Sequence, residues 1–509
     1  AVVAPPARLS RGAVVTSRPT LILLAIAAIC AAVVLLWERK LPGTDARREQ
    51  QGRLFPAADA ETIDRVVLEQ AEQRVELMRE DEGWLLTAPL SDRADAWRVD
   101  ELVRTVLEAK ANTMIPADQV KGGDDVTGLG QTALRAVLEA GTQHELPSRR
   151  YELEIGRTPA PGGVRYARVG GADALAIVDE ALAASIEQPV EQLRDRNLFR
   201  LAAVDIARLS LERADGARFV LERRANERWW LSPGAADGKS SGLVEDEADQ
   251  SEVAALVSEL VRLRAEDFAD EAELAEHRLE PAPWRLELHP RADEDAREPA
   301  GERENSAPTL DAVIVEIGAA VPGAEALHVV RVSDRASPFE VRVSTLLDQL
   351  RSLGDDPHAW RSRRVFAFSS FEVRELELER GPERVTLQRA TAEDETERAW
   401  SPRHPEDFPL DAGKLDTWLS NVSRLEALRL LEAPAHETQA APRAHVTFHV
   451  AGDDHSVPET LEILGCEADE CLARRSGRSA VLVLSRESAE LIDPQQLREA
   501  ASDEGGEEP

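Results

Sequence analysis

The 509-residue sequence lacks local signatures by which several enzyme classes are recognised. It contains no His-Glu-x-x-His pair of the zinc metalloproteases and no signature of a cysteine nucleophile. Carboxylates are so abundant that a pair suited to glycoside hydrolysis could be assembled in many places, which makes them uninformative. The sequence therefore assigns no catalytic, cofactor-binding or metal-binding residue, and we expect a protein that is not an enzyme and carries no cofactor.

Basic residues are also in short supply. The chain has 61 lysines and arginines against 95 acidic residues, a formal net charge of −34 at pH 7. Because such a charge repels phosphate backbones, we expect no nucleic-acid partner. The chain closes on "SDEGGEEP", and this predicts an acidic disordered tail over residues 498–509. The length is too great for one hydrophobic core and predicts several domains.

One long hydrophobic run lies between Arg18 and Glu38. It has 17 apolar residues from Leu21 to Trp37, near the lower limit for a bilayer core of about 30 Å. A cleaved signal peptide is the rival interpretation, but the run is followed by "LLWERKLPG" rather than by a small-residue cleavage site. The run therefore predicts a single uncleaved transmembrane helix over residues 19–38.

The flanks of this run suggest an orientation. The preceding residues 1–18 contain arginines and no acidic residue, as in a segment that stays in the cytoplasm. We therefore expect a bacterial inner-membrane protein with a short basic cytoplasmic segment, a linker at 39–59 and a large periplasmic C-terminal region.

A pattern of strands followed by an amphipathic helix occurs three times. Its first copy has two strand-like runs in "TIDRVVLEQAEQRVELMRE", then "GWLLTAP", then a helix with apolar residues at i, i+3, i+4, i+7 and i+8. A tryptophan and a proline precede the helix in every copy, which favours a core position over a ligand contact. The three helix stripes are Val99, Leu102, Val103, Val106 and Leu107; Val253, Leu256, Val257, Leu260 and Val261; and Leu415, Trp418, Leu419 and Val422.

The second halves of the copies agree as well. "YELEIG", "VIVEIG" and "TLEILG" fall at comparable places, and "LRDRNLF" and "WRSRRVF" precede the next copy at similar distances. Successive hairpins imply mainly antiparallel sheets with helices on one face. The predicted fold class is therefore α+β: an N-terminal transmembrane helix followed by three tandem modules.

We place these modules at residues 60–199, 200–365 and 366–497. The second module carries two polar insertions, "GAADGKSSGLVEDEADQ" at 234–250 and a stretch at 289–306, which are typical of mobile acidic loops.

The order of these motifs resembles the bacterial domain of unknown function 4340. The similarity is clearest over residues 60–200, which contain an A-D step before the helix, the G-L step Gly128-Leu129 and a Y-x-R strand with Tyr166 and Arg168. The third copy lacks both the Y-x-R strand and a clear G-L step. The resemblance brings no catalytic residues. It implies a membrane-anchored protein associated with ABC transporter subunits of the gliding-motility type. The matching residues are Trp84, Pro89, Asp95, Gly128, Leu129, Gly156, Tyr166 and Arg168.

Three short motifs resemble ligand-binding sites, but each is better explained as a loop, a turn or a strand. "DGKSSG" at 237–242 ends like a phosphate loop but lacks the glycine such a loop needs earlier, where Pro233 stands. Three Gly-Asp-Asp steps could hold calcium, but they stand at inequivalent places in the copies and are typical of turns. His445 and His449 lie in a strand-like run, about 13 Å apart along one face, too far to bind one zinc ion together.

Two further features leave alternatives open. Cys466 and Cys471 could close a small hairpin as a disulfide outside the cytoplasm, or remain free thiols. The Trp229-Trp230 pair could stack on a sugar, although one ring is expected in the core.

Two functions follow as expectations from these observations. The first is a non-enzymatic, membrane-anchored accessory or scaffold subunit of a bacterial envelope complex, for which the resemblance implies ABC transporter subunits as protein partners. The alternative is an envelope carbohydrate- or peptidoglycan-binding protein or hydrolase.

Overall fold

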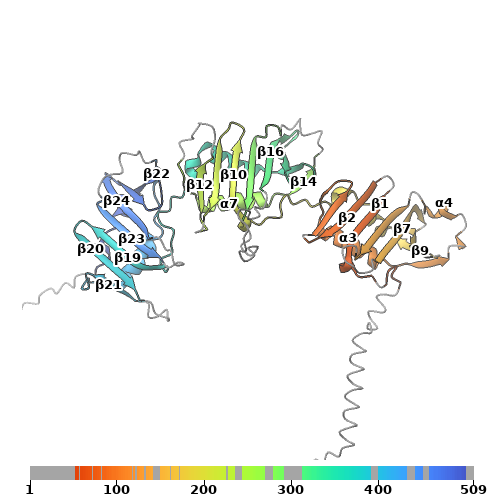
Figure 1. The fold of residues 1–509 in the computed structure, drawn as a ribbon, viewed down its shortest axis with the longest axis horizontal. Coiled ribbons are helices and arrows are strands. Elements are labelled where there is room, and N and C mark those ends of the chain that lie inside the picture. Colours follow the sequence, from red (N-terminus) through yellow and green to blue (C-terminus); the bar gives the residue numbers. More distant parts are fainter. Residues whose placement is uncertain are drawn as a thin grey trace, which may run out of the picture. The chain divides into compact units, whose positions relative to one another are not determined.

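The computed structural model describes most of residues 52–499. The chain divides into two compact units, Ala1–Asp195 and Arg196–Pro509. The first unit contains one sheet and the second contains two (Figure 1). We call the three sheets with their helices module 1 (52–195), module 2 (196–362) and module 3 (363–499). The residues outside the description are 1–51, 57, 71–72, 82, 117–118, 121–122, 131–132, 142–148, 161, 171, 173, 225–226, 235–243, 270–278, 292–311, 391–398, 433–441, 451–457 and 500–509.

Module 1 is built on a nine-stranded antiparallel sheet with the order β4-β3-β2-β1-β6-β7-β8-β9-β5. Its strands are β1 (Ile63–Gln70), β2 (Gln73–Glu80), β3 (Gly83–Ala88), β4 (Asp92–Arg93), β5 (Thr113–Pro116), β6 (Leu134–Ala140), β7 (Arg149–Ala160), β8 (Val164–Val169) and β9 (Ala174–Asp179).

Module 2 repeats this topology with nine antiparallel strands in the order β13-β12-β11-β10-β15-β16-β17-β18-β14. The strands are β10 (Ile206–Arg213), β11 (Arg218–Arg223), β12 (Trp229–Pro233), β13 (Asp246–Glu247), β14 (Ala265–Phe268), β15 (Trp284–Pro290), β16 (Val313–Val321), β17 (Ala324–Val332) and β18 (Phe339–Arg342).

Module 3 has the same order with eight described strands, β21-β20-β19-β23-β24-β25-β26-β22. They are β19 (Val373–Arg380), β20 (Glu383–Arg389), β21 (Trp400–His404), β22 (Arg429–Leu431), β23 (Ala444–Val450), β24 (Glu459–Glu467), β25 (Glu470–Arg475) and β26 (Val481–Ser485). The place that β4 and β13 take beside β3 and β12 has no counterpart strand in the described part of module 3.

Each module has a long helix after its first strands, of which there are four in modules 1 and 2 and three in module 3: α3 (Ala96–Glu108), α7 (Gln250–Val261) and α9 (Ala412–Val422). Each begins where an aspartate accepts hydrogen bonds from the backbone of the first turn, as N-caps do. These aspartates are Asp95, Asp249 and Asp411. The shorter helices are α4 (Gly123–Thr127), α5 (Glu180–Ile186), α6 (Val190–Leu193), α8 (Ser344–Asp355), α10 (Arg486–Glu490), η1 (Ala60–Thr62), η3 (Ala203–Asp205), η6 (Pro357–Trp360) and η8 (Pro494–Leu497).

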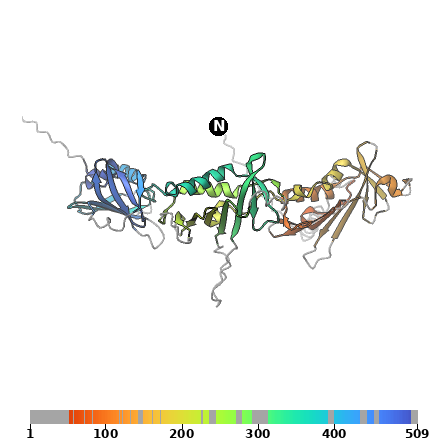
Figure 2. The ribbon, with the colours of Figure 1, turned by 90° about the horizontal axis from the view of Figure 1, so that it is seen from above.

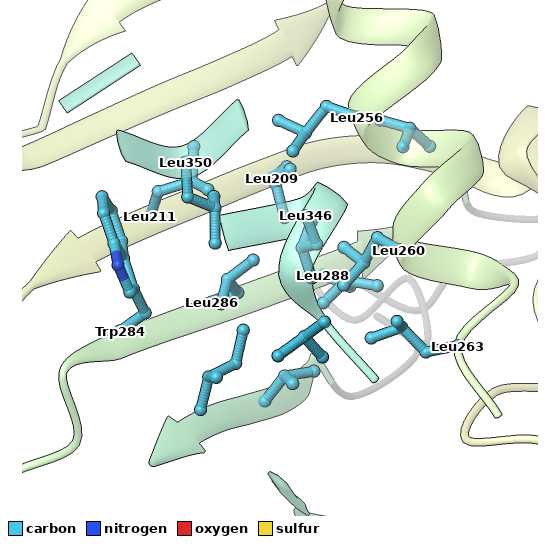
Figure 3. Packing of buried hydrophobic residues seen from close by; sticks show 14 of the residues in the cluster. Leu209, Leu211, Leu256, Leu260, Leu263, Trp284, Leu286, Leu288, Leu346 and Leu350 are labelled. Carbon is cyan, nitrogen blue, oxygen red and sulfur yellow. The ribbon is translucent and has the colours of Figure 1, made fainter. Parts of the chain in front are cut away.

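The helices lie on one face of each sheet, as the view of module 2 in Figure 2 shows for α7 and α8. Leu209 and Leu211 of β10 point to the same side as Leu286 of β15, and pack beneath Leu256 of α7 and Leu346 of α8 (Figure 3). The alternation of a strand therefore places every second residue in the core. The predicted helix stripes are confirmed: all of their residues are buried except Val261, which is partly buried.

The predicted fold class was wrong in its first element. No helix in the part of the chain that the structure describes is long and apolar enough to cross a membrane. The run at 19–38, from which we predicted a transmembrane helix, lies outside the described residues, as does the segment before it. Seventeen apolar residues were at the lower limit for a span, so the length of the run supported the prediction only weakly. Three mainly antiparallel sheet modules stand without that helix.

The predicted mobile loop at 234–250 also needs correction. Residues 235–243 lie outside the description, but Asp246 and Glu247 form the edge strand β13 and are 0% and 2% exposed. The acidic composition had favoured a solvated loop. The structure instead buries both acids against arginines that lie far away in the sequence.

Candidate functional site

The recurrent tryptophans form cross-strand pairs with arginines at the step from the first hairpin to the long helix. In module 1, Trp84 of β3 stands opposite Arg79 of β2, whose guanidinium carbon lies 4.7 Å from the indole centroid. The indole Nε1 and Arg79 both donate to Asp100 of α3, at 2.9 and 2.5 Å. Trp84 is 2% exposed, so this ring fastens the sheet to the helix.

The same pair occurs in the other modules. Arg223 lies 4.9 Å from the Trp229 ring, and Arg389 lies 5.6 Å from the Trp400 ring, each from the opposite residue of the neighbouring strand. Trp229 is buried and Trp400 is half-buried against its core. Trp230, on the other side of β12, is covered by Arg224 at 4.0 Å. These rings serve in packing rather than as an open sugar platform.

A buried acid and a buried arginine close each of the first two modules. In module 1, Asp92 of β4 accepts two hydrogen bonds from Arg194, at 2.9 and 2.7 Å, and the two side chains are 0% and 4% exposed. In module 2, Asp246 of β13 accepts the same two bonds from Arg361, at 3.1 and 2.8 Å. Both arginines follow the last helix of their module. The pair ties the end of each module to an edge of its sheet.

Module 3 replaces the acid by an aromatic ring. Phe408 takes the place of Asp92 and Asp246, three residues before the helix-capping aspartate. The guanidinium of Arg498 lies 5.1 Å from the Phe408 ring and pairs with Glu383 at 2.5 Å. The arginine is therefore kept, while its buried partner changes from a charge to a π face.

Around Asp246 the pair grows into a network that joins modules 2 and 3. Arg478, in the turn after β25, donates through Nε and Nη2 to the two oxygens of Asp246, both at 2.9 Å. Arg475, at the end of β25, donates to Glu247 at 2.9 Å. Glu247 also pairs with Arg228. We call this set, with Arg361, the acid–arginine joint.

Burial makes the charged state of the arginines in this joint less favourable. Burial, reinforced by the charge of Arg475, lowers the pKa of Arg228 to about 10. Burial also lowers the pKa of Arg475, against the opposing effect of Glu459. Buried ions cost several kcal/mol of desolvation each, and they are tolerated where partners with good geometry surround them. Removing Asp246 therefore takes from Arg361 and Arg478 the acid that they share, and in the described part of the chain only Arg361 has a second ion pair, with Glu432.

The connection between the two modules leaves little slack. Arg361 forms a β-bridge with Ala248 of module 2, and Arg364 forms one with Glu426 of module 3. Two residues, Ser362 and Arg363, separate these bridges, and such a step spans at most about 10 Å. The Ser362 amide donates to Glu247 O at 2.8 Å. Backbone pairing and the buried charges thus act on the same short connection.

The sheet face opposite the helices carries repeated glutamate–arginine pairs. Each pair joins directly opposed residues of two neighbouring strands: Glu154–Arg168 at 3.3 Å, Glu316–Arg331 at 2.6 Å and Glu462–Arg474 at 2.5 Å.

The third pair corrects the prediction that module 3 lacks the Y-x-R strand. β25 supplies it as Leu472-Ala473-Arg474, with leucine in place of tyrosine.

A hollow of about 300 Å³ lies on this open face in module 2. The strands β10, β11 and β15 supply its polar lining, in which arginines and glutamates alternate. The lining includes Arg208, Ser210, Glu212, Arg218, Arg285 and Glu287. Arg218 pairs with Glu212 at 2.8 Å and Arg285 with Glu316 at 3.1 Å, so the charges largely neutralise one another. The hollow presents mixed charge and no set of groups converging on one ligand.

Cys466 and Cys471 form a disulfide between directly opposed residues of β24 and β25. Cys471 is 1% exposed and packs in the core of module 3. The bond closes the end of this hairpin.

The weighed metal motifs do not come together in the described residues, where no group of three or more potential ligands could hold a metal ion. His445 and His449 both lie on β23, and His445 faces Glu379 at 3.6 Å. Of the Gly-Asp-Asp steps, Gly123 begins α4 and Gly354 lies at the end of α8. The third step and His455 lie outside the described residues.

The segment at 237–242 lies outside the described residues too. Its residues 238–242 also have the Gly-x-Ser-x-Gly spacing of a hydrolase nucleophile elbow. Such an elbow joins a strand to a helix, whereas the described elements on either side are the paired antiparallel strands β12 and β13.

The acid–arginine joint was missed from the sequence, although its signal was present. "LRDRNLF" and "WRSRRVF" each place an arginine, Arg194 or Arg361, at the second position. Each copy of the A-D step before the helix has an acid two residues before its alanine, namely Asp92 and Asp246. Reading the two motifs as partners would have predicted the pair.

Comparison with known proteins matches residues 84–282 and 316–445 to a family described as Domain of unknown function (DUF4340). No curated protein matches the chain.

Proposed function

Since this chain belongs to the DUF4340 family, we propose that it is a non-enzymatic accessory or scaffold subunit, whose modules bind protein partners in a bacterial envelope complex. The observation that carries the proposal is the acid–arginine joint. A buried charge network on a two-residue connection holds module 3 against module 2, as a scaffold requires when it presents several surfaces together.

The disulfide supports a place outside the cytoplasm. Such bonds persist in oxidising compartments, of which the bacterial periplasm is one. We accordingly propose a periplasmic location for the three modules. The finer form of the proposal, taken from the family resemblance, names an ABC-type transport system of the gliding-motility type as the complex.

An affinity pulldown from a detergent extract of the native host tests this proposal. Recovery of ABC transporter subunits with the tagged chain in a fixed ratio is the expected result. Retention on cell-wall polymer without such partners would contradict it and favour a carbohydrate-binding function.

A variant of the joint supplies the matched control. Arg478→Ala removes one donor to Asp246 and leaves the open sheet faces unchanged. If the scaffold must hold modules 2 and 3 in fixed relation, the variant recovers several-fold less of any partner that contacts both modules. Equal recovery by the variant would show that the joint has no part in partner binding.

A further inference from the structure

The acid of the joint stands at a position that can be identified in every module. It lies three residues before the aspartate that caps the long helix and is paired with the arginine after the module's last helix. We call it the acceptor position. The residues there are Asp92 in module 1, Asp246 in module 2 and Phe408 in module 3.

The arginine that joins from the next module also has a defined position. In each module a tight turn follows the strand that carries the open-face arginine. The backbone amide of the fourth residue after that arginine donates a hydrogen bond to the carbonyl oxygen of the residue three positions earlier. These bonds are Ala172 to Val169 at 3.0 Å, Arg335 to Val332 at 3.1 Å and Arg478 to Arg475 at 3.3 Å. We call the place of this fourth residue the donor position. The residues there are Ala172, Arg335 and Arg478.

The two positions meet at the joint of modules 2 and 3. Arg478 binds Asp246 through two nitrogens and also donates to the backbone oxygens of Ser362 and Arg364 in the connection, at 2.8 and 3.0 Å. The donor residue thus contacts the acid of one module and the chain that links the two. Asp246 is 0% exposed and binds Arg361 and Arg478 together.

The remaining residues differ in a consistent direction. Module 3 has Phe408 as acceptor, 5% exposed and covered by its own Arg498, so it offers no carboxylate to a further module. Module 1 has Ala172 at the donor position, an exposed residue whose side chain has no charged group. An acid and an arginine therefore meet at the junction of modules 2 and 3, whereas Phe408 and Ala172 bring no charge to the corresponding positions of modules 3 and 1.

We propose that the acceptor and donor positions determine which module edges can be joined. An aspartate at the acceptor position admits a module that carries arginine at the donor position, and Phe408 and Ala172 close their own edges of modules 3 and 1 against a second copy of this chain. A carboxylate buried by a neighbour needs a donor from that neighbour, whereas Phe408 meets its arginine within one module. The inference is independent of the partners proposed above, because its test contains only this chain.

Two full-length variants, Phe408→Asp and Ala172→Arg, test the proposal. Each opens one closed edge, so a one-to-one mixture acquires a matching acceptor and donor on different chains. We expect sedimentation to show a weight-average mass about twofold above that of either variant alone, and longer head-to-tail oligomers when one chain carries both changes. Phe408→Asn mixed with Ala172→Arg is the uncharged control and stays at the mass of the single variants.

A reverse experiment decides the matter if Phe408→Asp does not fold. Asp246→Phe gives Arg361 the aromatic partner that Arg498 has, and Arg478→Ala removes the donor without touching module 2. The connection contains Arg361, Arg363 and Arg364, which trypsin can cleave once it is exposed. We expect cleavage at these sites to rise about tenfold in both variants while the modules stay intact.

Two results would overturn the proposal. One is a mixture of folded Phe408→Asp and Ala172→Arg chains that shows no association. The other is cleavage of Asp246→Phe and Arg478→Ala at the wild-type rate. Either would show that the residues at these positions do not govern joining.

Discussion

Asp246 in module 2 and Phe408 in module 3 occupy the same place in the same fold and meet the same arginine, yet they belong to different kinds of edge. Asp246 accepts from Arg361 of its own module and from Arg478 of the next. Phe408 belongs to the hydrophobic core of module 3 and meets Arg498 of the same module. A single position can thus close a module by itself or make it depend on its neighbour.

The difference lies in what each residue requires. A phenyl ring loses nothing when it is buried beside a guanidinium, since the apolar surface and the cation–π contact both favour burial. A carboxylate must recover the hydration that it loses, and two arginines from two modules supply the bonds. In module 2 the aspartate therefore depends on the junction for half of its arginine bonds, and in module 3 the phenylalanine does not.

The largest effect is expected from Asp246→Ala. It leaves Arg361 and Arg478 buried without their acid and should lower the unfolding free energy of modules 2 and 3 by about 3 to 5 kcal/mol. Denaturant unfolding followed by tryptophan fluorescence measures the loss. Asp215→Ala is the matched control, because Asp215 pairs with Arg213 at an exposed site and should cost less than about 1 kcal/mol. Equal losses would remove the distinction between the joint and a surface pair.

Phe408→Ala should have the next largest effect, about 3 kcal/mol, through lost burial and a cavity beneath Arg498. The loss should fall on module 3 alone, so hydrogen exchange should rise there and remain unchanged in module 2. Exchange that rises equally in both modules would show that the Phe408 edge is coupled to the joint after all.

Reduction of Cys466–Cys471 should cost about 2 kcal/mol or less, because the bond closes a short loop. The melting temperature of Cys466→Ser/Cys471→Ser, compared with that of the oxidised chain, gives this value. The joint should be unaffected, so tryptic cleavage at the connection stays at the wild-type rate. Faster cleavage there would mean that the hairpin end supports the joint.

The smallest effect concerns pH at the closed edge of module 3. Burial raises the pKa of Glu383, but hydrogen bonds from Arg498 and Gln495 outweigh it and hold the pKa below its ordinary value of 4.5. Its stabilising contribution is therefore present above about pH 4.5 and is lost as the pH falls through the lowered pKa. Glu383→Gln should reduce the loss of unfolding free energy at acid pH by under about 1 kcal/mol, as measured by thermal melts at a series of pH values. An unchanged loss would assign the acid sensitivity elsewhere.

The regular part of the fold follows from local pattern, as particular residues show. The stripe from Val99 to Leu107 identified α3, because a helical period is written within one segment. Trp84 and its counterparts could be read as core positions, because they recur at one step. Asp95 could be placed before a helix, and the structure makes it the N-cap.

The sequence did not reveal which charged residues are buried in ion pairs. Asp246 and Glu247 stand in a polar, acidic stretch that looked like a solvated loop. Three of the arginines that bind them lie 115 to 232 residues away, namely Arg361, Arg475 and Arg478. Local composition carries no information on such pairing. The arginine of the third Y-x-R strand, Arg474, was hidden for a simpler reason: leucine replaced the tyrosine that marked the motif.

The most direct test of the account is a distance measurement across the joint. Spin labels on Ala326→Cys of module 2 and Asp416→Cys of module 3, in a chain with Cys30→Ser, report the separation of the two modules by pulsed electron resonance. We expect a single narrow distance distribution that broadens in Arg478→Ala and Asp246→Ala and stays narrow in Asp215→Ala. A distribution that is already broad in the parent chain, or one that stays narrow without Asp246, would contradict the claim that the buried acid–arginine joint fixes module 3 to module 2.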